Sequence, residues 1–265
     1  MNKKILIIVL FCSFLIHAQD TLLFNKDYIP YTDTTIIFKP VNYNPSVSYP
    51  LVFMLHGWSG NYAQWGEDAD LQGYANKDSL IIVCPDGFYD SWYINSPVKK
   101  NSQYVKFFFN DLVPKIFAKF NIDRKNIFIT GLSMGGHGAI YLYLTHSKFF
   151  KSAGSTSGIL DITAFPKNWG LPKVLGPFDS TAGSWKDFSD IYLLKNTKGN
   201  KIPIIVDCGS EDFAFDVNKR FDEKCKELGI PIDFITGPGS HNHDYWKRSI
   251  VKHFQLFKSL IEESK

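Results

Sequence analysis

The chain has few of the residue patterns that mark cysteine-stapled, metal-binding or nucleic-acid-binding proteins. Only four of its 265 residues are cysteine, and Cys12 lies in an apolar N-terminal run. The other three, Cys84, Cys208 and Cys225, are widely spaced. Three cysteines at such distances build neither a disulfide framework nor a zinc site, so we expect no metal centre. One disulfide between two of them stays open in an oxidising compartment.

Basic and acidic residues are nearly balanced, and no basic block stands out. The chain holds 29 Lys and Arg against 26 Asp and Glu, which gives a net charge of +3. This balance excludes nucleic acid and an anionic membrane as expected partners. Internal repeats, low-complexity segments and linkers are also lacking. A hydrophobic fraction of 45% suits one large domain with a sizeable core.

The first 18 residues differ from the rest of the chain. Lys3 and Lys4 precede an apolar run over residues 5–16, which ends near a small residue. This order is typical of a secretory signal peptide, and the run is short for a membrane-spanning helix. We predict a signal peptide over 1–18 and one domain over 19–265, secreted or periplasmic and without a stable membrane anchor after cleavage. A retained N-terminal anchor is the alternative.

Short, continuous apolar runs alternate with helix-like stretches after this leader. Continuous runs indicate strands that are buried on both faces, as in a parallel sheet. Their alternation with helices predicts a doubly wound α/β sheet with helices on both faces. The runs lie at 34–38, 51–55, 80–84, 127–130, 202–208 and 231–236, and the helix-like stretches at 103–120, 217–228 and 245–261. Pro114 is expected to kink or restart the first helix.

Residues 160–200 break the alternation of strand and helix. They are rich in Pro, Trp, Gly and Ser. We expect an insertion packed over the top of the sheet, either as a partial lid or as a surface excursion.

Residues 131–138 read Gly-Leu-Ser-Met-Gly-Gly-His-Gly between a predicted strand and a predicted helix. In that context Gly-x-Ser-x-Gly is typical of a nucleophile elbow. Gly131 and Gly135 lack a Cβ and so permit the sharp turn. The motif predicts that the Ser133 hydroxyl is a nucleophile, and that the Met134 N–H is one donor to the oxyanion formed in acyl transfer.

A serine hydroxyl needs an adjacent base, and histidine is the usual one. His241 and His243 follow the glycine turn after the last predicted strand, where the order Ser, acid, His places the base. His241 is closer to the turn, and the family resemblance described below also favours it. The acid is expected after the strand at 202–208. Asp212 and Glu211 both qualify there, and Asp207 and Asp216 are weaker candidates.

A second oxyanion donor is expected from the loop His-Gly-Trp-Ser-Gly after an early strand. The N–H of Trp58 is the best candidate, and His56 is expected to brace the loop. Aromatic walls suit aryl, acyl or sugar groups, so Trp92 and Tyr93 are expected to line the substrate cleft together with Trp246. The alternative for each aromatic residue is ordinary core packing.

These segments together resemble the esterase-D-like branch of the α/β hydrolases. That branch includes feruloyl and acetyl-xylan carbohydrate esterases, tributyrin esterases, S-formylglutathione hydrolases and mycolyltransferases. The resemblance is carried by residues 55–62, 84–87, 91–93, 131–138, 207–212, 237–241 and 245–246. It implies an α/β-hydrolase fold with Ser133 as nucleophile, Asp212 as acid, His241 as base, and Trp58 and Met134 as oxyanion donors. Relatives often carry tryptophan where His243 stands, which leaves the leaving-group side of the pocket open.

The sequence therefore predicts a secreted serine carboxylic-ester hydrolase that works through an acyl-enzyme on Ser133, without metal or organic cofactor. Its partner would be a small-molecule or polysaccharide-linked ester. The export signal favours feruloylated or acetylated polysaccharide and disfavours S-formylglutathione, which is cytosolic. Short-chain acyl esters, siderophore esters and acyl transfer are alternatives. A glycan-binding module on an inactive hydrolase scaffold is the non-enzymatic one.

Overall fold

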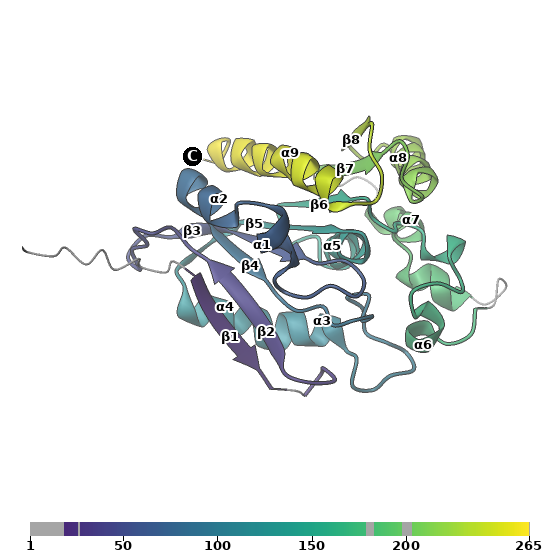
Figure 1. Ribbon diagram of the computed structural model, residues 1–265, viewed down its shortest axis with the longest axis horizontal. Helices are drawn as coiled ribbons and strands as arrows, with labels where there is room; N and C mark the ends of the chain where they lie inside the picture. The colour runs from purple at the N-terminus through teal and green to yellow at the C-terminus, as the bar shows by residue number, and fades with distance from the viewer. Residues whose placement is uncertain (1–18, 26, 179–182, 198–202, 265) are drawn as a thin grey trace, which may run out of the picture.

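The computed structural model describes residues 19–25, 27–178, 183–197 and 203–264. Its centre is an eight-stranded sheet in the order β1-β2-β4-β3-β5-β6-β7-β8 (Figure 1). Within this sheet β2 pairs antiparallel with both of its neighbours, and the pairs from β4 to β8 are parallel. The strands are β1 Gln19–Phe24, β2 Asp33–Phe38, β3 Tyr49–Leu55, β4 Ile81–Cys84, β5 Ile122–Leu132, β6 Ser152–Thr156, β7 Ile204–Gly209 and β8 Ile232–Gly237.

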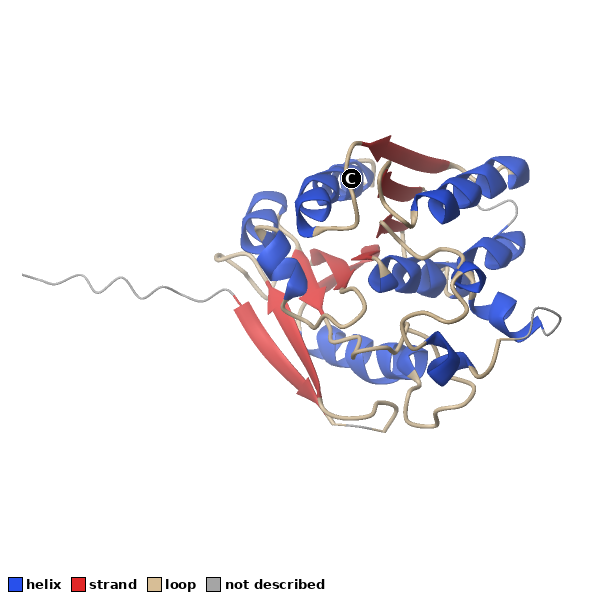
Figure 2. Ribbon diagram, turned by 45° about the vertical axis from the view of Figure 1, so that its right-hand side comes forward, coloured by secondary structure: helices blue, strands red, loops and turns tan. Residues whose placement is uncertain are grey.

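Helices cover both faces of the sheet (Figure 2). Outside the insertion, the helical segments are α1 Gln64–Asp68, α2 Leu71–Asp78, α3 Tyr104–Phe107, a π-helical turn Phe108–Leu112, α4 Val113–Lys119, α5 Met134–Thr145, α8 Phe215–Leu228 and α9 His243–Glu262. The doubly wound α/β architecture expected from the sequence is confirmed. Among the described residues, no helix has both the length and the apolar character needed to cross a membrane.

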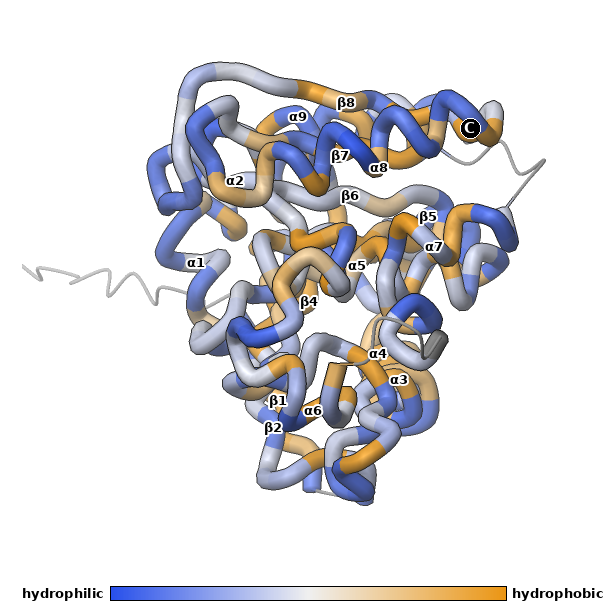
Figure 3. The backbone as a smooth tube through the Cα atoms, turned by 90° about the vertical axis from the view of Figure 1, so that its right-hand side faces the viewer, coloured by the Kyte–Doolittle hydropathy of each residue, from blue (hydrophilic) through white to orange (hydrophobic). Residues whose placement is uncertain are grey.

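Alternation along β3 shows how the sheet divides the core. Val52 and Met54 pack on one face against α1, α2 and α9. Leu51, Phe53 and Leu55 pack on the other face against α3, α4 and α5. Because successive side chains of a strand point to opposite faces, a wholly apolar strand serves two cores at once. Figure 3 shows α5 as one of the hydrophobic segments, and every residue of α5 from Met134 to Leu144 is buried.

The predicted helix over 103–120 is divided into three parts. α3 passes into the π-helical turn, and α4 begins at Val113. Pro114 lies just after the π-helical turn, and the backbone stays right-handed helical at Leu112 and Val113. The helix expected to kink or restart at this proline instead continues through it, with a local change to π-helical pitch just before it.

The insertion forms short helical turns beside α5 and α8. In its described parts these are η2 Ile162–Ala164, α6 Leu171–Leu175, η3 Gly183–Phe188, α7 Asp190–Leu193 and η4 Leu194–Thr197. α7 packs against both α5 and α8. The insertion is thus part of the helical layer on that face.

Two outcomes concern the cysteines and the leader. Cys84, Cys208 and Cys225 are all buried and free, so the disulfide left open by the sequence is not formed. Burial raises the pKa of the Cys225 thiol to about 12. The predicted signal peptide at 1–18 lies outside the described residues.

The parallel pairing of β3, β5, β7 and β8 brings their carboxyl ends to one edge of the sheet. Ligands of such sheets bind beyond this edge. The loops that carry Trp58, Ser133, Asp212 and His241 all leave from it.

Candidate active site

The turn between β5 and α5 places Ser133 in a strained backbone conformation. Its φ and ψ are 53° and −116°, outside the regions that residues with a side chain normally occupy. A Cβ at Gly131 would overlap the carbonyl group of Gly135, and a Cβ at Gly135 would overlap the carbonyl group of Leu55. Both glycines of the motif are therefore required by the close approach of the backbone.

Ser133, His241 and Asp212 form one hydrogen-bonded chain. The Ser133 Oγ lies 2.9 Å from His241 Nε2. The other ring nitrogen, Nδ1, lies 3.0 Å from both carboxylate oxygens of Asp212. An ionised carboxylate only accepts, so Nδ1 carries the proton and Nε2 is free to accept from the serine hydroxyl. This is the nucleophile, base and acid geometry of acyl transfer.

The carboxylate of Asp212 is fully covered, yet it stays ionised. Burial alone would raise the pKa of this carboxyl. The hydrogen bond and charge of His241 and the N–H of Ala214 lower the pKa, and together they outweigh the effect of burial. The resulting pKa of Asp212 lies below its ordinary value. The Ala214 N–H donates to Oδ1 at 2.8 Å. Asp212 therefore offers a fixed negative charge to the imidazole.

The other acidic candidates lie elsewhere. Glu211 and Asp216 are exposed, while Asp207 is buried and accepts from His253 at 2.6 Å. That second buried pair also engages Thr130, which lies 2.7 Å from the His253 Nδ1.

His243 does not share the serine with His241. Its Nδ1 pairs with Asp68 at the end of α1. The His243 ring lies 5.1 Å from that of Trp246, and its side chain is largely exposed. Burial raises the pKa of Asp68 against the opposing effect of His243.

The loop after β3 runs directly beside the serine. A Cβ at Gly57 would lie 3.5 Å from the Ser133 Cβ and only 2.7 Å from Leu132. No hydrogen bond in the described part of the chain engages the N–H of Trp58 or of Met134. Two free N–H groups flanking the serine are what a tetrahedral oxyanion requires.

All three expected cleft residues, Trp92, Tyr93 and Trp246, are buried in the core, which corrects the sequence-based expectation. The Trp92 side chain is 1% exposed and that of Tyr93 is 0% exposed. The Tyr93 ring fills the space beside Gly138, and its hydroxyl donates to the His56 carbonyl at 2.9 Å. Because neither side chain reaches solvent, neither can contact substrate, and both instead pack in the core next to the site.

Trp246 lies next to the catalytic histidine candidate, although it is also buried. Its ring meets the His241 ring edge-on at a centroid separation of 5.2 Å. The expected contact with substrate is thus replaced by a contact that fixes the imidazole.

Sequence reasoning missed three aromatic residues at the site. Phe213 follows Asp212 directly, and its ring lies 4.4 Å from the His241 ring. Trp169 of the insertion lies 5.5 Å from Phe213, and Phe165 lies 5.0 Å from Trp169. The position of Phe213 next to the acid was the one available signal.

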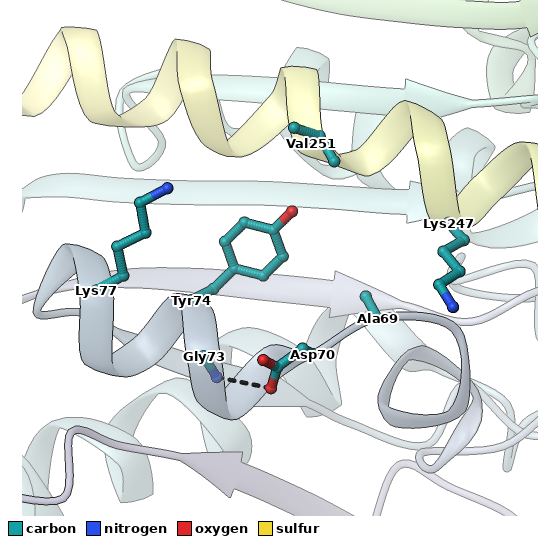
Figure 4. Close-up of a pocket in the computed structure, with 7 residues that line it drawn as sticks. All are labelled: Ala69, Asp70, Gly73, Tyr74, Lys77, Lys247 and Val251. Carbon is teal, nitrogen blue, oxygen red and sulfur yellow. Dashed lines mark hydrogen bonds between the residues drawn. The ribbon is translucent and has the colours of Figure 1, made fainter.

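A separate pocket of about 420 Å³ lies between α2 and α9 (Figure 4). Lys77 and Lys247 stand at its two ends, and the Tyr74 ring lies between them with its hydroxyl directed toward α9. The lining includes none of the hydrogen-bonded triad. Among the described residues, no three His, Cys, Asp or Glu side chains are grouped as a metal site needs.

The class of protein follows from the fold and this geometry. A serine on a strand-turn-helix elbow, hydrogen-bonded to a histidine that pairs with a carboxylate, defines a serine hydrolase of the α/β-hydrolase fold. The family model described as "Putative esterase" matches residues 30–257. The chain belongs to this family and is a serine esterase, which confirms the resemblance drawn from the motifs.

Similar proteins of known name include an acetyl esterase and S-formylglutathione hydrolases. The chain is 28% identical over 225 residues to an acetyl esterase of Caldicellulosiruptor saccharolyticus, covering 80% of this chain and 84% of that one. It is 25% identical over 225 residues to the S-formylglutathione hydrolase of Rattus norvegicus, covering 76% and 79%.

Solved structures share the fold over nearly the whole chain. The fluorophosphonate-binding serine hydrolase FphF of Staphylococcus aureus superposes with a TM-score of 0.80 at 22% identity, covering 91% of this chain and 98% of that one. A ferulic acid esterase superposes with a TM-score of 0.76 at 22% identity, covering 91% and 97%.

Proposed function

We propose that Ser133, His241 and Asp212 hydrolyse a carboxylic ester of a carbohydrate outside the cytoplasm. The observation that carries the catalytic part is the continuous chain from Ser133 Oγ through the imidazole to the Asp212 carboxylate. The substrate part is supported by two things. The apolar leader is typical of export, and an acetyl esterase and a ferulic acid esterase are among the similar proteins.

The reaction would proceed in two steps. His241 Nε2 takes the Ser133 proton while Oγ attacks the ester carbonyl carbon. The N–H groups of Trp58 and Met134 donate to the resulting oxyanion. When the intermediate collapses, the bond to the alcohol oxygen breaks, and His241 returns the proton to that oxygen. Water then attacks the acyl-enzyme by the same route, which releases the acid and restores Ser133.

Asp212 acts by holding one tautomer and orientation of the imidazole. Its two oxygens both face Nδ1, so Nε2 is aimed at the serine. The negative charge also stabilises the imidazolium that forms in each step. Because the carboxylate is covered, this charge acts in a medium that screens it less than water.

The catalytic part is tested with purified protein and p-nitrophenyl acetate. Ser133→Ala should lower kcat by several orders of magnitude and leave only the residual catalysis of the oxyanion donors and substrate binding. Ser210→Ala is the matched control, because Ser210 is exposed on the loop that follows β7. Equal rates for wild type and Ser133→Ala would overturn the assignment of the nucleophile.

The substrate part is tested with a panel of methyl ferulate, acetylated xylan, tributyrin and a tri-catechol siderophore. A dominant kcat/KM on ferulate or acetyl-xylan supports the carbohydrate esterase. A dominant rate on tributyrin or the siderophore contradicts it.

S-formylglutathione hydrolysis is the second candidate, because the similarity to the rat enzyme covers 76% of the chain. The same triad can cleave a thioester, with sulfur in place of oxygen as the leaving atom. Adding S-formylglutathione to the panel separates the two: a kcat/KM far above those for all oxygen esters would favour the thioesterase.

A further inference from the structure

Phe165, Trp169 and Phe213 form one aromatic surface beside His241, here called the aromatic platform. The rings are in mutual contact at centroid separations of 5.0 to 6.2 Å. Phe213 is 51% exposed, and the other two are partly exposed. Burial would stabilise such large apolar side chains, so an exposed cluster of them at an active site indicates a binding surface.

The backbone of Trp169 adopts a strained conformation. Its φ is 47°, and the following Gly170 has a φ of 73°. A left-handed conformation costs a tryptophan about 1 kcal/mol or more, and such strain gathers at functional sites. The buried Trp92 fixes this turn, because its Nε1 donates to the Trp169 carbonyl at 3.1 Å. Trp92, buried beneath the insertion, thus preorganises the Trp169 part of the platform.

The platform adjoins the histidine that protonates the leaving alcohol. Nε2 of His241 protonates the alcohol oxygen, so that oxygen comes within hydrogen-bond distance of the imidazole. Phe213 is packed against the same ring at 4.4 Å. The acyl oxygen lies instead against the N–H groups of Trp58 and Met134. We therefore expect an alcohol larger than methanol to extend from His241 toward the aromatic rings.

We propose that the aromatic platform binds the alcohol part of the substrate, and that this alcohol is a sugar ring. The negative face of an aromatic ring attracts the C–H groups on the face of a sugar, and the platform side chains carry no charge. This inference rests on the proposed carbohydrate esterase and adds the residues that recognise the carbohydrate. It also gives the insertion a role, since Phe165 and Trp169 both belong to it.

The order of the two reaction steps predicts that the platform acts in acylation only. The alcohol is present while the ester bond is broken and has left before water attacks the acyl-enzyme. Platform variants should therefore slow acylation by sugar esters and leave deacylation unchanged.

The test compares two esters of one acid: methyl ferulate and the ferulate ester of an arabinofuranoside. We expect wild type to prefer the sugar ester by tenfold or more in kcat/KM. Trp169→Ala and Phe213→Leu should lower this preference about tenfold, while kcat/KM for methyl ferulate changes less than threefold. Phe213→Leu keeps apolar volume against His241 and removes only the aromatic face. Phe178→Ala is the control, since Phe178 is an exposed aromatic of the insertion that packs on Trp185 instead.

Each outcome has one meaning. Equal losses on both esters would overturn the platform and assign Phe213 to support of the imidazole. Unchanged rates on both esters would show that these rings do not touch substrate. If wild type cleaves p-nitrophenyl acetate but neither the ferulates nor acetylated xylan, the carbohydrate esterase fails, and the platform as a sugar site fails with it. If wild type cleaves both ferulates without preference, only the platform fails.

Discussion

His56 holds the carbonyl group of the residue that follows it: its Nδ1 lies 2.7 Å from Gly57 O. A carbonyl only accepts, so Nδ1 carries the proton. The Gly87 N–H donates to Nε2 at 2.6 Å. In a trans peptide the C=O and the following N–H point in opposite directions. By fixing the Gly57 carbonyl, the neutral imidazole thus aims the N–H of Trp58.

We therefore predict that His56 is a positioning residue for the oxyanion. His56→Leu should lower kcat for p-nitrophenyl acetate by tenfold to a hundredfold and leave KM within threefold, because a misaimed donor weakens the transition state more than the ground state. The melting temperature, measured alongside, separates this effect from unfolding. A rise in KM at constant kcat would contradict the role.

Asp212→Asn should lower kcat by about 10⁴-fold with the protein still folded. An asparagine can present its NH₂ group to Nδ1 and so favours the wrong tautomer of His241. Because the pKa of Asp212 lies below its ordinary value of 3.8, wild-type kcat/KM should show no inflection from this carboxylate above about pH 4. Steady-state kinetics across pH check both statements. Glu211→Gln, on the exposed neighbour, is the matched control and should keep full activity.

Strands such as β3 and β4 could be predicted because their side chains are apolar on both faces. β6 shows why another strand escaped. β6 reads Ser-Ala-Gly-Ser-Thr, yet all five residues are buried. A Cβ at Gly154 would overlap the His253 ring, which lies over this strand from α9. The glycine in β6 is thus required by a side chain about a hundred positions away in the sequence, which no local pattern can show.

The residues of the site also include some that the local sequence predicts and others that it does not. Ser133 and His241 could be predicted because each follows a strand end with a glycine turn, and Asp212 because one such loop carries acids. Whether an aromatic residue near them is covered depends on partners distant in sequence. Tyr93 is buried because Gly138 leaves room for its ring, whereas Phe213 beside Asp212 stays exposed.

Relief of the strained serine should stabilise the protein. Ser133 has a φ of 53° and a ψ of −116°, a conformation that glycine reaches at little cost and alanine does not. Ser133→Gly should therefore raise the free energy of unfolding by about 1 kcal/mol relative to Ser133→Ala, with both variants inactive. Urea denaturation of the pair measures the difference. Ser133→Gly less stable than Ser133→Ala would show that the turn is unstrained.

The pair of His137 and Asp190 links the insertion to the elbow helix. Asp190 in α7 lies 2.9 Å from His137 Nδ1 in α5, and both side chains are fully buried. Burial raises the pKa of Asp190 to about 6, against the opposing effect of His137. The folded protein thus holds this proton more tightly than the unfolded chain does, whose carboxyl titrates near 3.8.

This raised pKa should appear in the pH dependence of stability. The tighter proton binding of folded Asp190 adds to the free energy of unfolding. This stabilisation is fully present below about pH 4 and is lost as pH rises to about 6, and it amounts to at most roughly 3 kcal/mol. Asp190→Asn stays neutral at every pH, so the difference in unfolding free energy between variant and wild type should change across this window and be constant above it. Denaturation in urea at closely spaced pH values measures this difference. Asp187→Asn, three positions earlier and exposed, should give a difference that is flat with pH. A flat difference for Asp190→Asn as well would mean that the buried carboxyl titrates normally in the folded protein.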